Sequence, residues 1–142
     1  MSISSYESRI ARIFSSDKEV FNFISDIRNF ERFVRNDIIT DWQADKRSCN
    51  FRVPTLGNIN LYVTDTKPDS RIAFSGTILN SNPFSLYFLI SGISDNSAEV
   101  KVTLDADLNP VLKMMAEKPI CQFLETLVNE MEKFNGWRDI KV

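Results

Sequence analysis

The chain of 142 residues contains no histidine, only two cysteines and only four glycines. Without imidazole it cannot form Ser-His-Asp or Cys-His nucleophile systems in their usual form, His-ligated zinc, or a His general base. Lys and Arg number 17 against 19 Asp and Glu, which gives a net charge of −2. This charge provides no general electrostatic attraction to the phosphate backbone of nucleic acids. We therefore expect no nucleic-acid partner, no metal site and no cofactor.

Long hydrophobic runs are also missing. The longest apolar stretch, Phe84 to Ile90, is far short of the roughly 20 residues that a membrane-spanning helix needs. The N-terminus has no apolar run before a small-residue cleavage site. We expect one soluble cytoplasmic domain over residues 1–142, with no stable membrane insertion and with Cys49 and Cys121 as buried, reduced thiols.

The N-terminal part predicts a strand followed by two short helices. Residues 5–14 indicate the strand, although its inward face cannot be assigned. Ser16 and Glu19 form a capping-box pattern that begins the first helix. Asn29 is the predicted cap of the second. The apolar stripe comprises Val20, Phe23, Ile24 and Ile27 in the first helix and Phe30, Phe33 and Val34 in the second.

From about residue 38 the apolar period becomes two and persists for some seventy residues, interrupted by turn signals. Six strands are expected, in an antiparallel meander with one apolar face. Their apolar positions are Trp42 and Ala44; Cys49, Phe51 and Val53; Ile59, Leu61 and Val63; Ile72, Phe74, Gly76 and Ile78; Phe84, Leu86, Phe88 and Ile90; and Val100, Val102, Leu104 and Ala106.

The last predicted element is a long helix with Asn109 as N-cap and Pro110 at its first position. Pro119 lies inside the pattern and predicts a kink or break, because proline removes a backbone donor. Gly136 is a suitable stop. The apolar stripe is Leu112, Met115, Ile120, Phe123, Leu124, Leu127, Val128, Met131 and Phe134.

This order of elements resembles the START-like, birch-pollen-allergen-like superfamily, also called SRPBCC or polyketide cyclase/dehydrase-like, in a single-domain bacterial form. The resemblance covers the whole chain and lies in patterning: SSDKEVFNFISDIRNFERFV, PFSLYFLI and ADLNPVLKMMAEKP carry it, and none is a catalytic signature. It implies an α+β helix-grip fold, in which a seven-stranded curved antiparallel sheet wraps around the long C-terminal helix, with two short helices after the first strand.

The resemblance also implies a mainly apolar cavity between the helix and the concave face of the sheet. Each position that would line it could instead belong to an ordinary core, and for any single position the core is the favoured interpretation. The candidate ligand-binding residues on the sheet are Trp42, Phe51, Val53, Leu61, Val63, Phe74, Gly76, Ile78, Phe84, Leu86, Phe88, Val102 and Leu104. Those on the helix are Met114, Met115, Phe123 and Leu127, with the two methionines as an adaptable lid beside Pro119.

Catalytic candidates are few. Asp105 and Asp107 alternate with inward positions and are expected on the solvent side, as are Asp41 and Asp45. Thr40 and Cys49 are the inward-facing polar candidates, and neither has a base beside it. Arg28, Arg32 and Arg35 are either a solvated helix face or a contact for an acidic head group. No catalytic residue is predicted.

Three functions follow, in order of preference. The first is binding or transport of a small hydrophobic molecule, such as a lipid, isoprenoid or polyketide-like compound. The second is a cyclase- or dehydratase-like enzyme, and the third is an interaction module resembling the chaperone-activator branch. Tyr62, Tyr87 and Leu89 fall on the convex face and make a homodimer surface there a further candidate.

Overall fold

The computed structural model describes residues 3–33, 39–54, 56–79 and 82–137. Its elements are β1 (Ile3–Glu7), β2 (Ala11–Ile13), α1 (Asp17–Ser25), η1 (Ile27–Phe33, a 3₁₀ helix), β3 (Thr40–Ala44), β4 (Ser48–Val53), β5 (Gly57–Lys67), β6 (Arg71–Ile78), β7 (Asn82–Ser94), β8 (Ser97–Asp107) and α2 (Pro110–Lys133).

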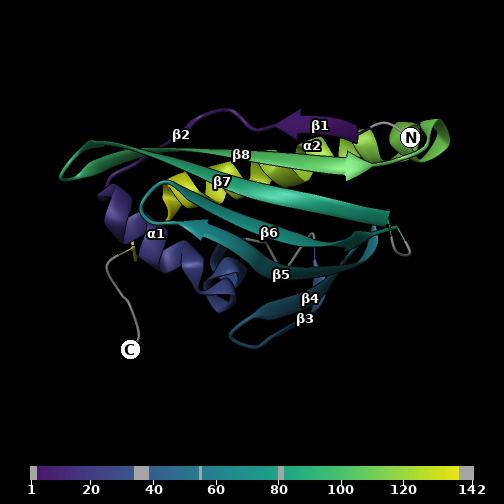
Figure 1. Cartoon of the computed structure of the whole chain (residues 1–142), viewed down its shortest axis with the longest axis horizontal. Helices are drawn as coiled ribbons and strands as arrows, with labels where there is room; N and C mark the ends of the chain where they lie inside the picture. Colours follow the sequence, from purple (N-terminus) through teal and green to yellow (C-terminus); the bar gives the residue numbers. More distant parts are fainter. Residues whose placement is uncertain (1–2, 34–38, 55, 80–81, 138–142) are drawn as a thin grey trace.

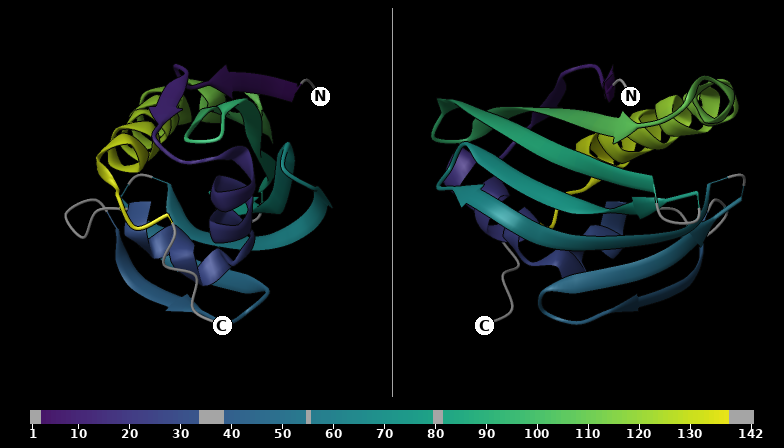
Figure 2. Two further views of the ribbon diagram at one scale, coloured as in Figure 1. Left: turned by 90° about the vertical axis from the view of Figure 1, so that its left-hand side faces the viewer. Right: turned by 45° about the vertical axis from the view of Figure 1, so that its right-hand side comes forward.

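The strands form one curved antiparallel sheet in the order β1-β8-β7-β6-β5-β4-β3, and β2 also pairs with β8. The sheet curls around the helices, with α2 along one side and α1 and η1 within the curve (Figures 1 and 2). The α+β helix-grip prediction is confirmed, with eight strands in place of seven.

The additional strand arises because the first predicted strand is interrupted by a bulge. Residues 8–10 on one side oppose residues 101–102 on β8, so one residue is inserted into the pairing. Ser8 stabilises the interruption: its hydroxyl accepts a hydrogen bond from the Val102 N–H at 2.9 Å, and its own N–H donates to the Val102 carbonyl at 2.8 Å. The inserted residue reverses the alternation, which is why simple periodicity did not identify an inward face.

The start of α1 follows the predicted capping box. The Ser16 hydroxyl accepts from the Glu19 N–H at 3.2 Å, and the Glu19 carboxylate accepts from the Ser16 N–H at 3.0 Å. The predicted cap of the second helix is wrong, because η1 begins at Ile27, before Asn29. The Asp26 carboxylate accepts from the Arg28 N–H there, at 3.1 Å. Val34 lies outside the described residues.

Helix α2 begins as predicted, with the Asn109 side chain accepting from the Leu112 N–H at 2.9 Å and Pro110 as its first residue. A break at Pro119 was wrong, since the helix is continuous to Lys133. Buried Ala116 and Ile120 hold the helix against the core on both sides of the proline. None of the helices in the described ranges is both long and apolar enough to cross a membrane.

Candidate functional site

The concave face of the sheet carries the side chains that alternation assigned to it. Of the thirteen predicted sheet positions, Trp42 and Val63 are partly buried and pack against the core. The other eleven are buried: Phe51, Val53, Leu61, Phe74, Gly76, Ile78, Phe84, Leu86, Phe88, Val102 and Leu104. Cross-strand pairing aligns them in rows, one of which runs Val63, Phe74, Leu86, Leu104.

Phe30 of η1 lies at the centre of this face. Its ring centroid is 6.2 Å from Phe51 of β4 and from Phe88 of β7, and 6.4 Å from Phe74 of β6. It also lies 6.3 Å from the ring of Trp42 and 6.4 Å from that of Phe123 on α2. One side chain from a short 3₁₀ segment therefore joins the aromatic groups of the sheet to those of the helix.

Two of the four predicted residues on α2 face the interior and two do not. Phe123 is 5% exposed and Leu127 is fully buried. Met114 and Met115 are 82% and 59% exposed, which corrects the expectation that they lie over the interior. Ala116 takes the inward position in this turn, and at about 100° per residue Met115 lies to one side of the buried stripe and Met114 lies on the opposite face of the helix.

Gly76 permits a close approach between neighbouring strands. A Cβ at this position would overlap the backbone oxygen of Asn60 on β5 and would meet the Phe84 ring at 3.2 Å. The group that approaches this glycine is thus the backbone of the adjacent strand.

The sequence interpretation missed two polar residues on the concave side, Ser4 and Tyr6 of β1. They are 7% and 8% exposed, and Tyr6 pairs with Leu104, so it extends the row that contains Phe74. The buried Tyr6 hydroxyl has no hydrogen-bond partner among the described residues. Burial raises the pKa of this phenol and the neighbouring Ser4 side chain offsets part of that rise. The phenol is therefore protonated at neutral pH and can donate a hydrogen bond. The alternation in residues 4–6 did not reveal which side chains point inward, because the bulge that follows reverses the pattern.

One member of each acidic pair is engaged in a hydrogen bond. Asp105 accepts a hydrogen bond from the Ser5 hydroxyl at 2.7 Å. Asp45 accepts from the backbone N–H groups of Arg47 and Ser48, which lowers its pKa and shows its role as a turn cap. Within the described ranges no cluster of three or more His, Cys, Asp or Glu side chains could hold a metal ion.

The two cysteines have different environments. Cys49 is buried as expected, and burial raises the pKa of its thiol to about 12. Cys121 is exposed on α2, which corrects the prediction that both thiols are buried. Neither forms a disulfide. Thr40 is also exposed, so it adds no polar group to the interior.

Of the three candidate arginines, the structure describes Arg28 and Arg32. Arg28 pairs with Asp26 at 2.6 Å, which lowers the pKa of that carboxyl. Arg32 is exposed, and Arg35 lies outside the described residues.

On the convex face, Tyr62 and Leu89 are 45% and 38% exposed, as alternation predicted. Tyr87 is partly buried there and has the Arg71 guanidinium 6.0 Å from its ring centroid.

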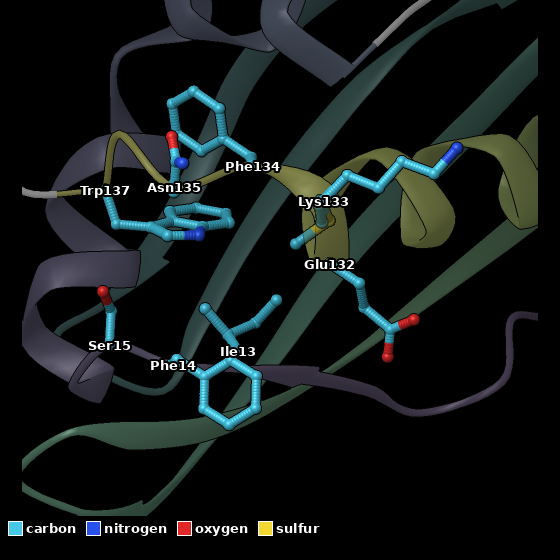
Figure 3. A pocket seen from close by; sticks show the side chains of 9 residues that line it. Ile13, Phe14, Ser15, Glu132, Lys133, Phe134, Asn135 and Trp137 are labelled. Atoms are coloured by element: carbon cyan, nitrogen blue, oxygen red, sulfur yellow. The ribbon is translucent and has the colours of Figure 1, made fainter.

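A separate cavity of about 280 Å³ lies where the end of β2 meets the C-terminal end of α2 (Figure 3). Its lining includes Ile13 and Phe14 from the β2 segment and Glu132, Phe134 and Trp137 from the end of α2 and the residues after it. None of its residues belongs to the predicted ligand-binding set, and sequence reasoning gave no signal for it.

No protein-family model matches the sequence, and no curated protein matches it significantly. Solved structures do match. A START superfamily protein from Mycobacterium smegmatis aligns with a TM-score of 0.63 and 16% identity over 92% of this chain and 94% of that chain. Norcoclaurine synthase from Thalictrum flavum aligns with a TM-score of 0.70 and 8% identity over 93% and 86%. The same enzyme in complex with dopamine and hydroxybenzaldehyde gives a TM-score of 0.66 and 5% identity over 94% and 89%. At these identities the likeness establishes the fold: the chain has a START-like fold of the SRPBCC type.

Proposed function

We propose that this START-like domain binds a small, mainly apolar molecule, such as a lipid, isoprenoid or polyketide-like compound, between α2 and the concave face of the sheet. The observation that carries the proposal is the aromatic interior centred on Phe30. Apolar and aromatic side chains of this kind line most small-molecule sites in proteins. Burial of apolar ligand area would supply the free energy of binding.

Phe30 occupies the position that a ligand would take. The rings around it come from α2 and from paired strands, whose backbones are held by regular hydrogen-bond ladders. Phe30 comes from a 3₁₀ helix, which has poorer hydrogen-bond geometry and is less stable than an α-helix. Among these rings, Phe30 is therefore the one whose displacement would disturb the least regular backbone hydrogen bonding.

Tyr6 offers the ligand a polar contact. Its hydroxyl is buried at the edge of the same face and has no acceptor within the described part of the chain. A ligand oxygen would satisfy this donor and fix the orientation of an otherwise apolar molecule.

Denaturing extraction of the purified protein, followed by mass spectrometry, tests the proposal. We expect an apolar compound in a stoichiometric amount. Leu104→Phe and Leu89→Phe are a matched pair, because the same enlargement fills the concave face in one and the convex face in the other. The inward variant should release less compound per protein, and the outward variant should match the wild type. Release of no compound, or equal release from both variants, would contradict the proposal and favour an interaction module.

A cyclase- or dehydratase-like enzyme is the second candidate, and Tyr6 is the observation that favours it. A buried phenol with a raised pKa donates a hydrogen bond or a proton to a substrate carbonyl. Norcoclaurine synthase shows that an enzyme is built on a similar fold. Tyr6→Phe keeps the ring and removes only the hydroxyl. Under this function it would abolish turnover of an identified ligand while leaving most of its binding, whereas under a carrier function no turnover exists to lose.

A further inference from the structure

The cavity at the end of α2 contains a buried hydrogen-bond donor without an acceptor. Trp137 is 2% exposed, and its indole Nε1–H has no partner among the residues that the structure describes. Figure 3 shows this nitrogen on the side of the ring that faces Ile13 and Glu132. Buried donors nearly always have an acceptor, so this N–H indicates an acceptor that the described residues do not supply.

Glu132 does not accept a hydrogen bond from this donor, and its carboxylate is held by other groups. One oxygen accepts from the Arg9 guanidinium at 2.6 Å, and the other accepts from the Arg12 N–H at 2.9 Å. The Arg9 contact lowers the pKa of Glu132, so the carboxylate stays ionised and its charge is paired with the guanidinium. The Lys133 ammonium is directed away from the cavity (Figure 3). The charged side chains of the lining therefore offer no unpaired charge to a ligand.

The walls of the cavity are aromatic. Trp137 is fixed from behind by Phe33, Phe134 and Phe23, whose ring centroids lie 5.2, 5.1 and 5.4 Å from its own. Phe14 lies at the rim with 84% of its surface exposed, so it adds little to the core. The exposed Phe14 ring is therefore free to stack on a flat molecule at the rim, while the buried Trp137 ring forms the closed inner end.

We propose that this cavity binds a small neutral molecule with one aromatic ring and a carbonyl-type acceptor, which accepts the hydrogen bond from Trp137 Nε1. The volume of about 280 Å³ exceeds that of an engineered cavity of about 150 Å³ that accommodates benzene, so one ring with a short substituent fits. A cationic ligand is disfavoured because the donor faces it and the Glu132 carboxylate is already paired with Arg9. The site shares no residue with the predicted set on the concave face, so either can fail alone.

Three probes of nearly identical shape separate the possible chemistries. Acetophenone has the ring and the carbonyl, isopropylbenzene replaces the carbonyl by a methine and methyl, and 1-phenylethylamine is cationic at neutral pH. The chain has two Trp residues, so two indole N–H signals are expected in a ¹⁵N NMR spectrum, and loss of one in Trp137→Phe assigns them. We expect acetophenone to shift the Trp137 signal downfield, as a new hydrogen bond requires, and the other two probes to leave it in place.

The binding contribution of the rim is tested with Phe14→Ser, and Met114→Ser is the matched control. Both replace a side chain that is more than 80% exposed, at 84% and 82%, so neither should disturb folding. Phe14→Ser should weaken acetophenone binding about threefold to tenfold, and Met114→Ser should leave it unchanged. A Trp137 signal that ignores acetophenone, that responds equally to isopropylbenzene, or that responds best to the amine would overturn the proposal, as would equal effects of the two serine variants.

Discussion

Phe30→Ala is the change that most directly tests how the interior is organised. The side chain is 3% exposed and has five aromatic neighbours with ring centroids 6.2–6.4 Å away. Truncation of a buried Phe to Ala typically lowers the free energy of unfolding by about 3–5 kcal/mol, because apolar contacts are lost and a cavity remains. The surrounding rings belong to five different elements that cannot all move inward, so we expect the upper part of that range.

The same substitution should increase binding of an apolar molecule. A neutral fluorescent probe such as N-phenyl-1-naphthylamine should bind more tightly to Phe30→Ala than to the wild type, since the vacated space lies between α2 and the sheet. At a concentration 100 times its Kd, the probe should restore about 2.7 kcal/mol of the lost stability. Urea unfolding with and without the probe measures both effects.

Phe33→Ala is the matched control. Phe33 lies three residues later in η1, is 1% exposed, and packs against Phe134 and Trp137 with ring centroids 5.4 and 5.2 Å away. The probe should perturb the indole signal of Trp42 in Phe30→Ala and that of Trp137 in Phe33→Ala. A Trp42 signal that does not change when the probe binds to Phe30→Ala would refute the assignment of Phe30 as the side chain that fills the interior.

Three further substitutions test other parts of the structure. Gly76→Ala should lower the free energy of unfolding by about 3 kcal/mol or more, because its Cβ overlaps the backbone of β5; urea unfolding measures this. Glu132→Gln should remove a stabilisation of up to about 1 kcal/mol that is present above about pH 4.3 and lost as pH falls through the lowered folded pKa of the carboxyl; unfolding at pH 3 and pH 7 measures this. Cys121 should react with a thiol reagent in the native protein, while Cys49 should react only on unfolding. The Cys49 thiol has a folded pKa of about 12, so above about pH 8.5, the pKa of an unfolded thiol, it loses its proton more readily in the unfolded chain. The free energy of unfolding should therefore fall as pH rises above about 8.5, and Cys49→Ala should reduce that fall.

A control variant or a contradicting outcome is available for each of these substitutions. Gly92→Ala brings a Cβ to 2.6 Å from the flexible Asp17 carboxylate, which can rotate away, so this variant should remain close to wild type. A similar loss of stability in both glycine variants would contradict the backbone explanation. An unchanged pH dependence in Glu132→Gln would contradict the assigned role of its ion pair, and rapid modification of Cys49 in native protein would contradict its burial.

Local patterning was sufficient for much of the fold. The alternation from Phe51 to Leu104 placed side chains on the correct face, because in a strand successive residues point to opposite sides whatever the partner strand is. The caps at Ser16 and Asn109 were identifiable for a similar reason, since a cap joins residues only two or three positions apart.

The sequence by itself thus determined the class of fold, the order of its elements and the apolar face of the sheet, all properties of neighbours along the chain. Only the tertiary structure decided that a bulge at residues 8–10 turns Tyr6 inward, that Phe30 fills the centre, and that Met114 and Met115 face solvent. It also brought Phe14 and Trp137 to one cavity from opposite ends of the chain. These features depend on contacts between distant segments and on the space that packing leaves, and no local periodicity encodes either.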